Sequence, residues 1–134
     1  MPHFDGLLHV QGRSIFVDDI PEPKGTLFAH VLTSPAARGR LTGLSTSAAE
    51  KSPGVEAVLT WRNIPGENQI GSIVMDEPLL AGEEVHYIGQ PVAVVLADSP
   101  SSARRACELI DMAIDRERPV LDPREAFSRG ELIV

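Results

Sequence analysis

Apolar and polar positions in the second half of the chain predict a strand, a helix and another strand in succession. Pro91–Ala97 (PVAVVLA) is an apolar run rich in valine, which is typical of a strand buried on both faces. The Ser99-Pro100 pair then supplies an N-cap and a first helical residue, so we expect the main helix to cover residues 99–109. From Ile110 to Asp115 apolar and polar residues alternate, as in a half-buried strand. We interpret this unit as a right-handed crossover that forms the core.

Further segments have the pattern of strands, and short helical turns separate some of them. The strands are predicted at residues 13–17, 26–33, 40–45, 55–60 and 84–88, and the turns at 47–50, 61–65 and 122–127. Both sides of Thr26–Thr33 (TLFAHVLT) are largely apolar, so we expect this strand to be central in its sheet. About six strands with one main helix predict an α+β domain, and we expect its sheet to be mixed.

Two segments lack a regular pattern. Residues 1–12 are predicted to be an N-terminal arm that lies on the surface or on a partner, ahead of a single domain at residues 13–134. Gly66–Gly82 is long for a connection, and we interpret it as an extended functional or interface loop.

Composition and charge exclude several classes of function. The length of 134 residues fits one domain, and 43% apolar with 23% charged residues is ordinary for a globular protein. The net charge of −7 argues against nucleic acid or an anionic membrane as a partner, since both require a positive surface. The single cysteine, Cys107, excludes an intramolecular disulfide and fits a reducing compartment. No apolar run approaches the length of a membrane span and the N-terminus lacks a signal-peptide pattern, so we expect a cytoplasmic protein.

The polar residues do not form a recognisable catalytic set. The acidic pairs Asp18-Asp19, Asp76-Glu77 and Glu83-Glu84 lie beside turn residues, and we expect them to serve solvation and turn hydrogen bonds. His3, His9, His30 and His86 have no metal-ligand spacing, and Cys107 lies on the apolar side of the predicted helix, where packing is its expected role.

Other motifs also fail as active-site signatures. Gly66–Gly71 (GENQIG) lacks the lysine of a phosphate-binding loop and precedes no helix. No serine has a GxSxG setting. Trp61 and Arg62 are expected to form a packed ring with a stacked guanidinium.

A family resemblance is carried by eight segments that occur in order between His9 and Phe127. They are residues 12–21 (GRSIFVDDIP), 26–35 (TLFAHVLTSP), 53–60 (PGVEAVLT), 63–71 (NIPGENQIG), 76–81 (DEPLLA), 85–96 (VHYIGQPVAVVL), 103–110 (ARRACELI) and 119–123 (PVLDP). With these segments the chain resembles the N-terminal α/β hammerhead domain of the molybdenum-binding large subunit of xanthine dehydrogenase and aldehyde oxidase. The DDIP loop followed by IPGENQIG indicates the xanthine dehydrogenase branch.

The resemblance implies an enzyme that hydroxylates hypoxanthine and xanthine. In that family water supplies the oxygen at a molybdenum–pterin centre, and electrons pass through iron–sulfur clusters and FAD to NAD. The residues of those sites belong to downstream regions or to other domains and subunits. We therefore expect no catalytic, cofactor-binding or metal-binding residue in this chain. The implied partners are the remainder of the molybdenum-binding subunit and the iron–sulfur and FAD subunits, with no nucleic acid and no membrane.

The same resemblance implies a structural role, and two loop-like segments are candidates for the contacts. They are Gly66–Gly82 and the turn at Gly89-Gln90-Pro91, which lack periodic cover of their own. The candidate interface residues are Ile70, Ile73, Met75, Leu79, Leu80, Gly89 and Gln90. An alternative interpretation is that these apolar residues fold back onto the domain's own sheet.

Two other functions compete with the enzyme-domain hypothesis. One is a free-standing scaffold or protein-binding module that keeps the fold without the enzyme. The other is a small independent hydrolase or metal enzyme, which the missing residue constellations disfavour.

Overall fold

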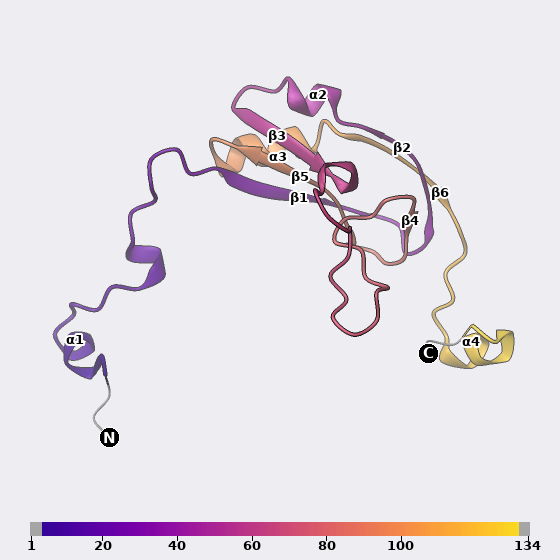
Figure 1. The fold of residues 1–134 in the computed structure, drawn as a ribbon, viewed down its shortest axis with the longest axis horizontal. Helices are drawn as coiled ribbons and strands as arrows, with labels where there is room; N and C mark the ends of the chain where they lie inside the picture. The colour runs from indigo at the N-terminus through magenta and orange to yellow at the C-terminus, as the bar shows by residue number, and fades with distance from the viewer. Residues whose placement is uncertain (1–3, 132–134) are drawn as a thin grey trace.

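The computed structural model describes residues 4–131, and Figure 1 shows their arrangement. The six strands are β1 (Phe28–Thr33), β2 (Gly39–Ser45), β3 (Val55–Thr60), β4 (Glu84–Val85), β5 (Pro91–Ala97) and β6 (Asp111–Arg116). The helices are α1 (Gly6–Val10), α2 (Ser47–Glu50), α3 (Pro100–Cys107) and α4 (Pro123–Arg129), with 3-10 helices η1 (Val17–Asp19) and η2 (Trp61–Asn63).

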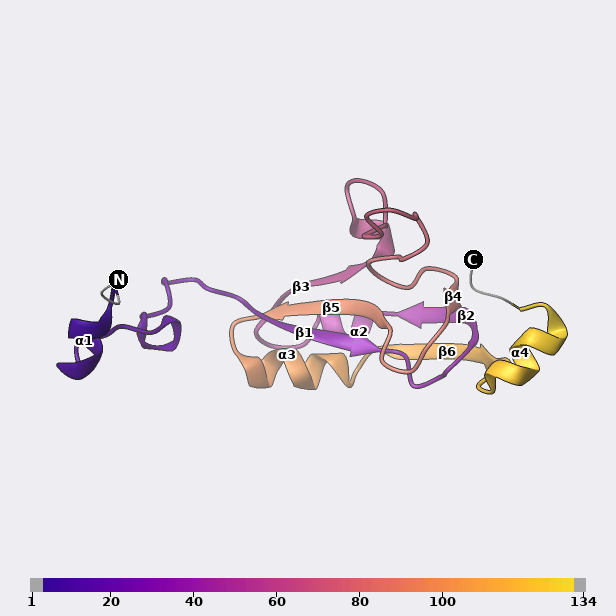
Figure 2. The same cartoon turned by 90° about the horizontal axis from the view of Figure 1, so that it is seen from below.

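The strands form two separate sheets. Sheet A has the order β1-β5-β3, sheet B has the order β4-β2-β6, and every pairing is antiparallel. The α+β class is confirmed, whereas the single mixed sheet of the sequence-based prediction is replaced by two antiparallel ones. In Figure 2 sheet B continues from sheet A toward the end of the molecule that carries α4.

β5 is the central strand of sheet A. Its bounds are those predicted, and its side chains are buried or half-buried throughout. Ala93 and Val95 face one core cluster and Val92 belongs to a second cluster, so both faces of the strand are in use. β1 is an edge strand, and alternate residues such as Val31 are exposed, so the expected central position of that strand is wrong.

α3 covers one face of sheet A. The Ser99 hydroxyl accepts the backbone N–H of Ser102 at 3.2 Å and Pro100 begins the helix, as predicted. Ala103, Ala106 and Cys107 are buried on the side of the helix that packs on β1 and β5. α3 therefore closes the main core.

The expected crossover unit is wrong. β5 and β6 lie in different sheets because β1 and β3 already occupy both edges of β5. β6 pairs with β2 instead, and Met112 and Ile114 pack against the second core cluster, whose buried members are Ala36, Ala81, Val85 and Val92. Leu44 of β2 packs against both clusters and links the two sheets.

Two predicted strands are shorter or absent for local reasons. Residues 13–17 are not a strand, since the backbone N–H of Phe16 is bonded by the Asp19 carboxylate at 2.9 Å and the chain turns into η1. The predicted strand 84–88 pairs only at Glu84–Val85 because the next N–H, that of His86, is bonded by the Gln90 side chain at 2.6 Å.

We expect Val95→Ala to lower the free energy of unfolding by about 2 kcal/mol, because it leaves a cavity in a fully buried position. The matched control is Val31→Ala on the neighbouring strand, where the side chain is 44% exposed and the loss should stay below about 1 kcal/mol. Urea denaturation of the two variants measures both values, and equal losses would contradict this description of the core.

Candidate interaction site

A loop with an ordered neck lies between η2 and β4. We call residues 64–82 the bridged loop, because the Asn68 side chain bridges its two ends. The Asn68 amide donates to the carbonyl oxygen of Leu80 at 2.6 Å and accepts the N–H of Leu80 at 3.0 Å. These two bonds satisfy the main chain of Leu80 as a neighbouring strand would. In Figure 2 the loop projects from sheet A on the side opposite α3.

Gln69 forms a second tie above the neck. Its side-chain oxygen accepts the N–H groups of Gly71 at 2.6 Å and Glu77 at 3.1 Å, and Ile70 donates its N–H to the Glu77 carbonyl at 2.9 Å. A Cβ on Gly71 would overlap the carbonyl oxygen of Val74, so the chain closes here only with glycine. The two amide side chains thus hold the loop in one conformation.

The tip of this loop, residues 70–75, is apolar and uncovered. Ile73 is 94% exposed and Met75 is 72% exposed, and Ile70 and Val74 are exposed as well. Tips of loops normally carry polar residues, and contiguous exposed apolar groups mark interaction sites. The ties of Asn68 and Gln69 therefore present an apolar surface to the outside of the domain.

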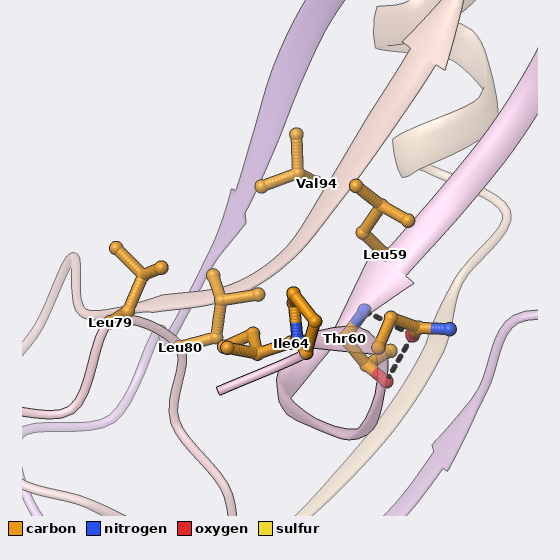
Figure 3. A pocket seen from close by; sticks show the side chains of 8 residues that line it. Leu59, Thr60, Ile64, Leu79, Leu80 and Val94 are labelled. Carbon is orange, nitrogen blue, oxygen red and sulfur yellow. Dashed lines mark hydrogen bonds between the residues drawn. The ribbon is translucent and has the colours of Figure 1, made fainter. Parts of the chain in front are cut away.

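An apolar groove lies at the foot of the loop (Figure 3). It has a volume of about 290 Å³ and is lined by Leu59, Thr60, Asn63, Ile64, Pro65, Leu79, Leu80 and Val94. The Asn63 side-chain oxygen already accepts the Thr60 N–H at 2.8 Å and its hydroxyl at 2.9 Å. No charged side chain lines the groove, so it suits an apolar group rather than acid–base chemistry.

The groove continues onto the open face of sheet A. Val31, Val94 and Leu59 are register partners across β1, β5 and β3, so their side chains share that face. Val31 and Leu59 are exposed and Val94 is half-buried. Leu59 and Val94 belong both to this row and to the groove, so the foot of the bridged loop, the groove and the row form one apolar surface opposite α3.

The candidate interface residues have different positions in this structure. Ile70, Ile73 and Met75 lie on the tip, and Leu79 is exposed at the groove. Leu80 is only 5% exposed and folds back onto the domain, which matches the alternative interpretation for this one residue.

Gly89 and Gln90 form a structural turn. Gly89 has φ +90° and donates its N–H to the Ser34 carbonyl, while the Ser34 N–H bonds the Gln90 carbonyl, both at 2.8 Å. The Gln90 side chain is 1% exposed and accepts the N–H of His86. A side chain enclosed by its own domain cannot also contact a partner, so we leave Gln90 out of the proposed interface and keep the exposed Gly89.

The acidic pairs have structural surroundings. Asp19 caps η1 through the N–H of Phe16. Glu84 lies 3.9 Å from Arg40, with both side chains more than half exposed. The main chain of Asp76-Glu77 closes the tip of the bridged loop through the Glu77 carbonyl. These positions do not bring two carboxylates to one cavity.

The histidines also lie apart. His9 contacts Ser14 through a 2.7 Å hydrogen bond, His30 lies in β1 and His86 follows β4, while His3 lies outside the described residues. Across residues 4–131 no three His, Cys, Asp or Glu side chains are grouped to hold a metal ion. The Arg62 guanidinium lies 5.0 Å from the centroid of the Trp61 ring, which confirms the predicted stacking.

Comparison with known proteins gives the family. Residues 11–118 match the profile described as aldehyde oxidase and xanthine dehydrogenase, a/b hammerhead domain. The chain belongs to this family. It is similar to the nicotine 6-hydroxylase large subunit of Paenarthrobacter nicotinovorans, with 36% identity over 97% of this chain and 17% of that one. Xanthine dehydrogenase 1 of Arabidopsis thaliana is 33% identical over 94% of this chain and 9% of its own.

The solved structures agree with the sequence comparison. The aldehyde oxidoreductase of Desulfovibrio desulfuricans superposes with a TM-score of 0.84 and 27% identity, over 96% of this chain and 15% of that one. The hammerhead fold of the molybdenum hydroxylases is thereby confirmed. The chain spans less than a fifth of the relatives that it matches, and those relatives are larger enzymes with further domains or subunits.

The hammerhead domain does not supply a cofactor site among its described residues. Enzymes of this family use molybdenum, iron–sulfur clusters and FAD. The groove offers no charged or thiolate group to such a cofactor, and Cys107 is 5% exposed inside the main core. The residues present therefore do not fit these groups. No helix within residues 4–131 has the length and apolar character needed to cross a membrane.

Burial raises the pKa of the Cys107 thiol, and the charge of Glu108 raises it further. The thiol packs among Val95, Ala106 and Ile110 and points its Sγ at the His30 carbonyl, 3.6 Å away. A thiol with a raised pKa is a poor nucleophile. Cys107 is thus a packing residue, as its place on the apolar side of the helix predicted.

We expect Asn68→Ala to loosen the neck of the bridged loop, because it removes both bonds to Leu80 while the tip ties of Gln69 remain. Hydrogen exchange at the Leu80 amide should become at least about tenfold faster. Glu67→Ala is the matched control, since the exposed Glu67 side chain makes no bond that closes the loop and its backbone carbonyl is unchanged. Unchanged exchange in Asn68→Ala would contradict the bridging role.

Cys107 gives a pH dependence with a definite sign. A group whose pKa is raised by folding stabilises the folded state below its unfolded value of about 8.5, and this contribution is lost as the pH rises through the folded pKa. The free energy of unfolding should therefore fall more between pH 8 and 10, a range of roughly two units, in the parent chain than in Cys107→Ala. Urea titrations at both ends of the range measure this difference, and parallel curves would refute it.

Proposed function

We propose that this chain is the structural hammerhead domain of a xanthine dehydrogenase. In the assembled enzyme it contacts the remainder of the molybdenum-binding subunit, which performs the oxidative hydroxylation of hypoxanthine and xanthine. Electrons then pass through the iron–sulfur and FAD parts to NAD. The observation that carries this proposal is the exposed apolar tip of the bridged loop together with the apolar groove and open face of sheet A, on a domain whose described residues form no catalytic set.

The energetics favour a contact at this surface. Covering an exposed Ile, Val or Met side chain contributes about 1.5 to 3 kcal/mol. Ile73, Val74 and Met75 are presented together by a loop that Asn68 and Gln69 already hold in place. Because the loop is ordered beforehand, little conformational entropy is lost when it binds. The tip is therefore suited to a permanent apolar contact.

The substrate assignment rests on the DDIP and IPGENQIG segments and on the similarity to proteins named xanthine dehydrogenase. Purine catabolism is the metabolic role that follows from this substrate. The reduced, buried Cys107 is consistent with the cytoplasm as the location. Similarity to a nicotine 6-hydroxylase, 36% over 97% of this chain, makes an N-heteroaromatic ring outside the purines the second candidate substrate.

The test is to purify the chain through an affinity tag from its native host. Molybdenum in the purified material is measured by mass spectrometry, and NAD reduction is assayed with xanthine and with nicotine. We expect molybdenum and xanthine-dependent turnover, both lost when the chain is deleted. Turnover with nicotine alone would keep the domain assignment and change the substrate. Recovery without molybdenum and turnover would overturn the proposal in favour of the scaffold.

Ile73→Asp should reduce the molybdenum that co-purifies with the tagged chain by at least about tenfold, because it places a charge on a surface that must lose its water. Leu109→Asp is the matched control. Leu109 is also exposed but follows α3, on the other side of sheet A. Equal losses in both variants would show that the tip has no special role in assembly.

A further inference from the structure

The segment that precedes β1 has local order of its own. We call residues 4–25 the N-terminal extension. The rings of His9 and Phe16 stack with their centroids 5.8 Å apart, and Ser14 bonds the His9 ring at 2.7 Å. The Arg13 N–H reaches the Leu8 carbonyl at 2.9 Å, which joins α1 to the following chain. Residues 5–19 thus form a small locally folded unit rather than an unstructured tail.

Every large apolar side chain of this extension is nevertheless exposed. The exposed fractions run from 41% at Leu8 to 99% at Phe4. The set consists of Phe4, Leu7, Leu8, Val10, Ile15, Phe16, Val17 and Ile20. Neither α1 nor η1 contains a buried residue. An ordered segment with this many uncovered apolar groups requires a surface to cover them.

The domain itself does not provide that surface. Figures 1 and 2, which view the molecule from directions 90° apart, both show the extension projecting from β1 away from the two sheets. The match to the Desulfovibrio desulfuricans aldehyde oxidoreductase covers 96% of this chain, so most of the extension is aligned with the longer protein. In that protein the aligned region is 15% of the chain, and the other 85% is available to cover the extension.

We propose that the N-terminal extension is a docking arm that binds an apolar groove on the remainder of the molybdenum-binding subunit. The arm also carries four carboxylates, those of Asp5, Asp18, Asp19 and Glu22, against the cations of Arg13 and Lys24, so basic side chains at the border of the groove complement its charge. This inference rests on the proposed function, because it needs the larger subunit as its partner. A second copy of the chain is the competing occupant, and the test separates the two.

Trypsin tests whether the arm is covered. Arg13 and Lys24 are exposed in this structure and are not followed by proline, so both bonds should be cut readily in a free arm. In the purified enzyme we expect cleavage at both sites to be at least about tenfold slower than in a synthetic peptide of residues 1–27. Val17→Ser changes an exposed side chain and leaves the internal contacts of the N-terminal extension in place. This variant should restore cleavage, whereas Leu109→Ser should not. Cleavage at the peptide's rate would overturn the proposal.

A photo-crosslinker identifies the occupant. Val17→p-benzoylphenylalanine places the reactive ketone at a position that is 83% exposed. Crosslinks to the molybdenum-binding region would support the docking arm. Crosslinks to another copy of this chain, or the absence of any crosslink, would overturn it. If the enzyme co-purifies with molybdenum but its arm stays uncovered, this inference is wrong and the proposed function stands. If no molybdenum-binding region co-purifies with the chain, the proposed function is wrong.

Discussion

The packing of β5 is the constraint on which the rest of the structure depends. Its Ala93 and Val95 side chains lie under α3, and this contact fixes the main core. On the opposite face the domain's own cover ends at Val92, which packs with the second cluster. Val94, two residues further along, faces the groove. The part of this sheet face around Val94 is therefore left uncovered by the described residues of the chain.

The bridged loop converts that open face into a defined surface. The side-chain amides of Asn68 and Gln69 form hydrogen bonds with main-chain groups of the same loop, so the tip is ordered without partner contacts. The side chains of Ile73, Val74 and Met75 stay exposed at the tip, and their burial against another protein surface is favourable. The ordered neck reduces the entropic cost of a contact at the tip, and the apolar side chains of the tip stabilise that contact.

The sequence predicted the bounds of β3 and β5 correctly, because both segments are rich in valine and a glycine-containing turn precedes each of them, with Gly54 before β3 and Gly89 before β5. It also located the N-terminus of α3 from Ser99 and Pro100. It could not show that Thr26–Thr33 lies at an edge, since exposed positions such as Val31 are apolar, as they would be in a central strand. The Asn68 tie was missed because its partner lies 12 residues away and no periodicity signals such a bond.

Oxidation of methionine by peroxide in the purified enzyme tests the central claim, that the apolar tip is buried in the assembly. Met75 is 72% exposed in this domain, and Met112 of β6, half-buried against the second core cluster, is the internal reference. The account predicts that assembly slows Met75 oxidation at least about tenfold relative to the isolated chain, with Met112 unchanged. Equal rates for Met75 in the enzyme and in the isolated chain would contradict it.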